Sequence, residues 1–175
     1  MDRSAGSLGS PVMRTGIEAA VVEHLDRLQA SYRLMDIDPS LADTAAFCEH
    51  YGVALEASAN AILVASRKPE GVHALCLALA TTKLDVNHAV KRLLDVRRLS
   101  FAPAELTKEL TGMEIGGVAP FGISSELPVY VDARITHLAT CVVGGGSRAM
   151  KVEVDPEVFS RMDGVSVVED LATNP

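Results

Sequence analysis

Tryptophan is absent from the 175 residues, and aromatic side chains make up only 4% of them. Base stacking on an aromatic platform is therefore not expected. The three cysteines, Cys48, Cys76 and Cys141, are far apart and form no CxxC pair. This spacing argues against a disulfide framework and against a cysteine-based zinc site. We expect three core cysteines in a reducing, cytoplasmic protein.

Long apolar runs are also missing. The longest, Ala74 to Ala80, has seven residues, whereas a membrane helix needs about 18. The first sixteen residues contain no apolar segment typical of a secretory signal. An apolar fraction of 48% predicts a globular chain. We expect a flexible tail over residues 1–15, a single domain over residues 16–173, and no membrane association.

Positive charge is scarce but concentrated. The formal net charge is −7, yet residues 67–98 contain seven basic and three acidic side chains. A basic block of this kind is typical of a phosphate-backbone contact. It is equally typical of a solvated helix face, and the charge pattern leaves both interpretations open.

The common catalytic and metal-binding motifs are absent. The five histidines show no HxxxH or HExxH spacing, and no GxSxG or GK[ST] motif occurs. We therefore expect no metal, no cofactor and no serine-based triad.

Periodicity predicts alternating helices and strands. Apolar residues recur at helical spacing, or follow a capping residue or proline, over residues 16–32, 45–50, 84–96, 104–110 and 156–161. Strands are expected over residues 33–38, 61–65, 72–80, 99–101, 129–131, 138–143 and 150–154. The second and third strands should form a central hairpin. The last alternates apolar and charged residues, which predicts a half-exposed strand.

Two glycine clusters are the most informative motifs. In the first, TGMEIGGVAPFG (residues 111–122), the amides of Gly116, Gly117 and Val118 can form a nest for a carbonyl or phosphate oxygen. The second, GGGSR (residues 144–148), follows an apolar strand. An ordinary tight turn explains the first cluster equally well, and a hairpin turn or bulge the second.

Residues 44–171 resemble the YbaK/prolyl-tRNA-synthetase-associated editing-domain family, whose members are trans-acting aminoacyl-tRNA deacylases. The resemblance rests on motifs in a shared order, namely SANAILVA (58–65), LALATTKLDVNHAVKRLL (77–94), TGMEIGGVAPFG (111–122), LPVYVDARI (127–135) and VVGGGSRAMKVEV (142–154). It implies an α/β fold of the α+β type, with a mixed, largely antiparallel, partly closed sheet flanked by helices.

The same resemblance implies an activity and a set of site residues. It implies hydrolysis of the ester of a mischarged tRNA, without metal or cofactor, with tRNA as partner and possibly a synthetase. The implied catalytic residues are Asn60, Gly116, Gly117, Val118 and Lys151. The implied substrate-binding residues are Thr111, Gly112, Ala119, Pro120, Phe121, Asp132, Gly144, Gly145 and Gly146. For the tRNA backbone they are Lys83, Lys91, Arg92, Arg97 and Arg98.

Two positions depart from the family pattern. Asn60 stands where the family typically has a lysine, and Lys151 stands where many members have an acidic residue. We hypothesise that Lys151 supplies the missing cation from the opposite wall. Alternatively, Lys151 is an outward-facing strand lysine, and the protein binds aminoacyl-tRNA, an amino acid or a nucleotide without turnover. The sequence names neither the amino acid, nor the tRNA, nor the oligomeric state.

Overall fold

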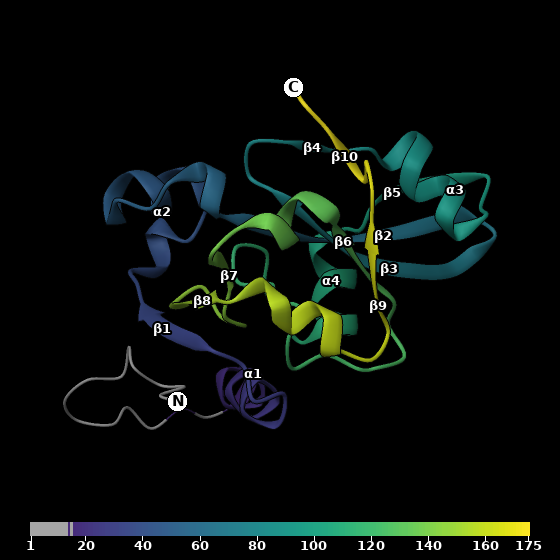
Figure 1. Cartoon of the computed structure of the whole chain (residues 1–175). Coiled ribbons are helices and arrows are strands. Elements are labelled where there is room, and N and C mark those ends of the chain that lie inside the picture. Colours follow the sequence, from purple (N-terminus) through teal and green to yellow (C-terminus); the bar gives the residue numbers. More distant parts are fainter. Residues whose placement is uncertain (1–13, 15) are drawn as a thin grey trace.

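The computed structural model describes residue 14 and residues 16–175, so most of the expected N-terminal tail lies outside the described residues (Figure 1). The α-helices are α1 (Gly16–Arg27), α2 (Thr44–Tyr51), α3 (Lys91–Leu94) and α4 (Ala104–Thr111). The strands are β1 (Tyr32–Asp36), β2 (Ala59–Lys68), β3 (Glu70–Leu79), β4 (Lys83–Leu84), β5 (Arg98–Phe101), β6 (Val129–Asp132), β7 (Cys141–Gly144), β8 (Met150–Val154), β9 (Val165–Val168) and β10 (Ala172–Thr173). Short helical turns are η1 (Pro39–Leu41), η2 (Leu55–Ala57), η3 (Val86–Val90), η4 (Ala133–His137) and η5 (Pro156–Arg161).

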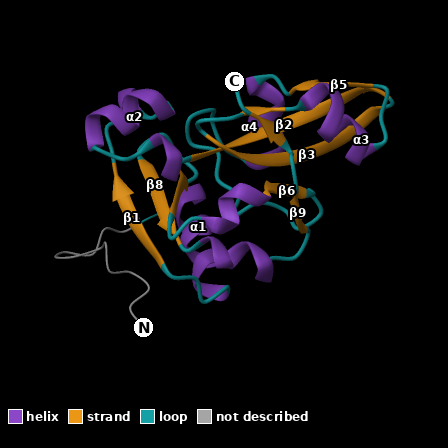
Figure 2. Cartoon of the chain, turned by 45° about the horizontal axis from the view of Figure 1, so that its top comes forward, coloured by secondary structure: helices purple, strands orange, loops and turns teal. Residues whose placement is uncertain are grey.

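The largest sheet has five strands in the order β5-β2-β3-β6-β9. The predicted hairpin, β2 with β3, lies at its centre as an antiparallel pair. The β3–β6 and β6–β9 pairs are parallel. In Figure 2 the long β2 and β3 strands extend away from β1 and β8, which lie at the other side of the molecule.

A second sheet has the antiparallel order β1-β8-β7, and β4 pairs with β10 as a separate ribbon. A parallel bridge between Ser58 and Val142 joins the first two sheets at the start of β2. The predicted mixed, largely antiparallel α/β fold is confirmed, with its strands divided among three open sheets. The bridge fixes where β7 and β8 lie relative to β2.

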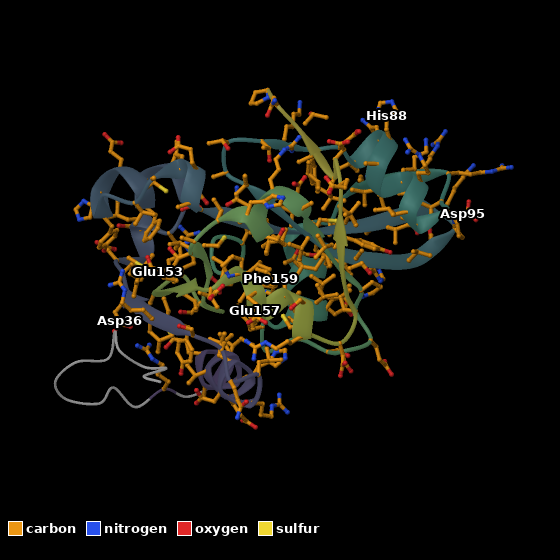
Figure 3. The ribbon with its side chains drawn as sticks, viewed as in Figure 1. Asp36, His88, Asp95, Glu153, Glu157 and Phe159 are labelled. Carbon is orange, nitrogen blue, oxygen red and sulfur yellow. The ribbon has the colours of Figure 1, made fainter. Side chains whose placement is uncertain are left out.

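The main core lies between the two larger sheets and α1. Val21 and Leu25 of α1 are fully buried in it. Phe159, labelled on η5 in Figure 3, stacks on Phe121 with the ring centroids 5.9 Å apart. Burial of each such side chain stabilises the fold by roughly 1.5–3 kcal/mol. The segment after α4 is therefore anchored at Phe121.

Several predicted boundaries were wrong. The helix expected over residues 84–96 is a short π-helical turn, η3, followed by α3, and it ends at Leu94 because Asp95 is left-handed. Leu84 belongs to β4, where it pairs with Ala172. The strand expected from residue 138 begins at Cys141, after η4. Strands β9 and β10 were not predicted, because their partners are distant in sequence. No helix in the described part of the chain is long and apolar enough to span a membrane.

Candidate functional site

A cavity of about 310 Å³ opens beside the first half of β2. Its walls come from the start of α2, the end of β5, the first glycine cluster, β7 and β8. Five of the predicted site residues line it, namely Asn60, Gly116, Val118, Gly144 and Lys151. The other lining residues are Asp43, Thr44, Ala59, Ala61, Ile62, Leu63, Phe101, Ala102, Thr107 and Ile115.

The cavity occupies an unpaired stretch of sheet edge. Strand β5 pairs with β2 only from Val64 onward, which leaves the edge of residues 60–62 open on that side. The amide of Ala102 donates to the Leu63 carbonyl at 2.9 Å, so the backbone polar groups of Leu63 face this edge. Backbone groups alternate sides along a strand. The N–H and C=O of Ala61 therefore face the cavity as well.

Lys151 is a buried lysine in the cavity wall, with 6% of its surface exposed. Its Nζ donates to the Gly116 carbonyl at 3.1 Å and lies 5.3 Å from the centroid of the Phe47 ring. Within residues 14 and 16–175 it forms no ion pair with a carboxylate. The prediction of a half-exposed strand is wrong at this position, because β8 is the central strand of its sheet and Lys151 points inward.

Burial lowers the pKa of Lys151 below its ordinary value of 10.5. Cys48 and Asp43 oppose this shift, and Arg148 adds to it. A buried ammonium without a carboxylate partner is costly to the fold. Such a group in a cavity wall is suited to a ligand oxygen that carries negative charge.

Asn60 also lines the cavity. Its Oδ1 accepts a hydrogen bond from Thr44 Oγ1 at 2.5 Å. Because the carboxamide oxygen is engaged, the Nδ2 group remains as the donor that Asn60 can offer to a ligand. Asn60 and Lys151 thus supply one neutral and one cationic donor to the same cavity.

The two glycine clusters meet backbone to backbone. The Gly146 amide donates to the Gly117 carbonyl at 2.7 Å. A Cβ on Gly117 would collide with the backbone of Ser147, and a Cβ on Gly144 with the carbonyl of Val118. Glycine is therefore required for the close approach of the two loops.

Of the three amides in the predicted nest, one forms a hydrogen bond within the described residues and two do not. The Gly117 amide donates to the Glu114 carbonyl at 2.8 Å and closes a turn. For the amides of Gly116 and Val118, the described residues provide no acceptor. Both residues line the cavity, so their amides are candidate donors to a ligand there.

Arg148 holds the first glycine cluster in place and was missed at the sequence level. It donates to the carbonyl of Ile115 at 2.8 Å and to Asp43 Oδ1 at 3.2 Å. It also donates to the carbonyl of Pro39 at 3.2 Å. Asp43, Thr44 and Thr107 were missed too. The only signal for Arg148 was its place in the GGGSR segment, since its partners lie far away in sequence.

Eight of the nine predicted substrate-binding residues do not line the cavity, and three of them support the glycine loop. Gly112 is the left-handed C-cap of α4. The Thr111 hydroxyl donates to the Thr107 carbonyl at 2.6 Å and accepts from the Met113 amide at 3.0 Å. The Ala119 amide donates to the Met113 sulfur at 3.1 Å. Four others lie elsewhere, with Gly145 and Gly146 in the turn, Phe121 in the core and Pro120 beside a separate hollow.

Asp132 lies at the C-terminal end of β6 and does not line the cavity. Its carboxylate accepts from the amides of Arg134 and Ala172, each at 2.9 Å, and lies 3.4 Å from the Arg134 guanidinium. These contacts cap η4 and hold β10. In the structure Asp132 joins two segments of backbone.

The basic block is only partly brought together. Arg67, Lys91, Arg97 and Arg98 line a surface hollow of about 360 Å³, which we call the basic hollow. The remaining predicted tRNA-backbone residues, Lys83 on β4 and Arg92 on α3, do not line it.

The three cysteines are free and buried, as predicted. Burial raises the pKa of both Cys76 and Cys141 to about 12. These two thiols are therefore protonated at neutral pH and cannot act as nucleophiles.

Comparisons with known proteins identify the family and the fold. A family model described as an aminoacyl-tRNA editing domain matches residues 38–162. The uncharacterized protein YwhH of Bacillus subtilis (strain 168) is 28% identical over 153 residues, covering 87% of this chain and 94% of that protein.

Two solved structures share the fold. A candidate trans-editing enzyme for prolyl tRNA synthetase superposes with a TM-score of 0.76 at 19% identity, covering 93% of this chain and 100% of that one. A hypothetical protein, APE2540, superposes with a TM-score of 0.77 at 22% identity, covering 87% and 99%.

Proposed function

Because this chain belongs to the aminoacyl-tRNA editing domain family, we propose that it is a deacylase that hydrolyses the ester of a mischarged tRNA in the cavity beside β2. The observation that carries this proposal is the buried Lys151 ammonium, which has no carboxylate partner among the described residues and lies in the same wall as the Gly116 loop. That placement matches the negative oxygen that ester hydrolysis develops.

The proposed reaction needs no side-chain nucleophile. A water molecule attacks the ester carbonyl carbon, and the carbonyl oxygen becomes an oxyanion. Lys151 Nζ and the free amides of Gly116 and Val118 stabilise that oxyanion. The bond between the acyl carbon and the ribose oxygen then breaks, and this oxygen leaves as the tRNA hydroxyl with the proton that the attacking water has lost. Removal of one such donor costs roughly 3–4 kcal/mol of transition-state stabilisation in a protease.

Asn60 takes a supporting part in this proposal. Its Nδ2 donates to the substrate or to the attacking water from the β2 wall, while Thr44 holds its Oδ1. The family lysine that Asn60 replaces would place a positive charge on that wall. In this chain the charge comes from β8 instead, through Lys151.

The first test follows amino-acid release from tRNA specific for proline that carries alanine, cysteine or serine. We expect the wild-type protein to release at least one of these amino acids faster than the protein-free reaction. A synthetase added in parallel shows whether it assists as a partner. Absence of release from every member of a broad panel would overturn the deacylase proposal.

A second candidate is a protein that binds the same ligands without turnover. The observation favouring it is the replacement of the family lysine by the neutral Asn60. An experiment in which the protein binds aminoacyl-tRNA but does not hydrolyse it would favour the binding protein over the deacylase. Under the binding proposal Asn60→Lys would create an activity that the wild-type protein lacks.

We further propose that the basic hollow contacts tRNA phosphates, and this predicts a salt-dependent affinity. Each phosphate contact contributes roughly −0.7 to −0.9 to the slope of log affinity against log salt. The double variant Arg97→Gln/Arg98→Gln should therefore reduce the magnitude of the slope by roughly 1.4–1.8. Titration of labelled tRNA at several salt concentrations measures this change.

The matched control is Arg33→Gln, which removes an exposed arginine of β1. Arg33 pairs with Glu153 of β8, and both belong to the three-stranded sheet, away from the basic hollow. This variant should leave the slope unchanged. An equal slope for the wild type and the double variant would contradict the phosphate contact and leave the block as a solvated helix face.

A further inference from the structure

We propose that Phe101 is the stacking platform for the terminal base of the tRNA, an inference that rests on the proposed function of the cavity. Phe101 ends β5 and lines the cavity. Phe101 is 56% exposed, whereas the other three phenylalanines, Phe47, Phe121 and Phe159, are buried. One exposed aromatic ring thus lies at the entrance through which the ester must pass.

A second exposed apolar side chain completes this entrance. Ile115 belongs to the first glycine cluster, lines the same cavity and is 53% exposed. Its carbonyl is held by Arg148, so the loop that carries it is anchored. Two exposed apolar side chains from separate elements, at one cavity, suit a flat apolar ligand group better than isolated surface residues would.

The direction of β5 indicates which ligand group that is. Arg98, at the start of the strand, lines the basic hollow, and Phe101 ends the strand at the cavity. Three residues of strand span about 10 Å. The basic hollow and an exposed ring therefore lie about 10 Å apart along one strand, with Arg98 and Phe101 on opposite faces of it because they are three residues apart. Positive charge along a backbone path next to a ring is the arrangement that binds single-stranded nucleic acid.

Stacking on Phe101 departs from the expectation, set by the low aromatic content of the sequence, that no aromatic platform stacks a base. A single terminal base needs only a single ring. Its nucleoside also carries the ester that enters the cavity, so stacking on Phe101 would fix the distance between base and ester. Phe101 is in this sense a positioning residue.

The test uses an uncharged tRNA whose 3′-terminal adenine is replaced by 2-aminopurine, a fluorescent base that is quenched by stacking. Wild-type protein should quench it on binding. Phe101→Ala should abolish the quenching and weaken binding by roughly 5- to 150-fold, the range measured for the loss of one stacked base. Phe101→Tyr retains the ring and should behave as wild type. The control Val167→Ala, at an exposed apolar residue on β9, should change neither quantity.

Hydrolysis assays separate this inference from the proposed function. With an aminoacyl ester of adenosine, Phe101→Ala should raise KM and leave kcat unchanged. With the methyl ester of the same amino acid, it should change neither. Quenching by a protein that hydrolyses nothing would support stacking and contradict the deacylase. Unchanged quenching and unchanged KM in Phe101→Ala would overturn stacking, and loss of synthetase binding alone would assign the entrance to a protein partner instead.

Discussion

Lys151→Met is expected to yield a protein that is more stable than the wild type and almost inactive. Methionine fills the space of the lysine stem without a buried charge, which removes the desolvation cost at neutral pH. Gains of this kind are about 0.5–2 kcal/mol. The lost contact with the Gly116 carbonyl, 3.1 Å in the wild type, offsets part of the gain. Deacylation should fall by roughly 10²- to 10³-fold, as for loss of an oxyanion donor.

The stability difference should depend on pH in a defined direction. The pKa of Lys151 is lowered in the folded protein by burial, so the unfolded chain binds more protons in the window between that lowered pKa and 10.5. Wild-type stability relative to Lys151→Met should therefore rise as pH increases through this window. Activity should move the opposite way, because deprotonation removes the cation.

Chemical denaturation and deacylation assays across pH measure both quantities. The control is Lys108→Met, which changes a lysine whose side chain is 66% exposed. Lys108→Met should change the free energy of unfolding at neutral pH by less than about 0.5 kcal/mol. It should leave the deacylation activity unchanged. Undiminished deacylation by Lys151→Met would contradict the role of this ammonium.

Gly117→Ala is expected to damage both the fold and the activity. The added Cβ would meet the backbone of Ser147 at less than the closest normal approach, so the two glycine clusters must separate. Overpacking of this kind costs about 1–3 kcal/mol. The displacement also moves the amides of Gly116 and Val118. A shift of about 1 Å in catalytic groups is enough for a 10²-fold loss of activity.

The comparison variant is Gly52→Ala at the C-cap of α2. Gly52 has φ of +69° but open space around it. The substitution should cost about 1–2 kcal/mol from backbone strain and leave the turnover of the folded protein unchanged. Thermal denaturation curves give the folded fraction of each variant, by which its activity is divided. Equal activity per folded molecule for Gly117→Ala and wild type would show that the loop contact does not position the site.

The two glycine clusters could be recognised as places of close backbone approach, which demands glycine itself, but the sequence did not show that they contact each other. The identity of Asn60 and Lys151 as cavity residues came from the family pattern. The burial of Lys151 did not follow from its alternating strand, since alternation does not reveal that β8 is central. Arg148 and Thr44 were missed because their partners, Ile115 and Asn60, are distant in sequence.

Asp132 lies apart from the cavity. The resemblance implies a substrate contact for this residue, and in the structure its carboxylate accepts a hydrogen bond from the Ala172 amide. Strands β9 and β10 were missed because the strands with which they pair, β6 and β4, are distant in sequence. Local pattern predicts elements, and tertiary contacts decide which polar residues serve the backbone and which face the cavity.

The most direct test is a crystal structure of the protein with an adenosine analogue whose 3′ ester is replaced by an amide, which resists hydrolysis. The account predicts that the acyl carbonyl oxygen lies within hydrogen-bond distance of Lys151 Nζ and of the Gly116 or Val118 amide. An analogue bound instead in the separate hollow beside Pro120 and Arg161, or bound with its carbonyl away from Lys151, would contradict it.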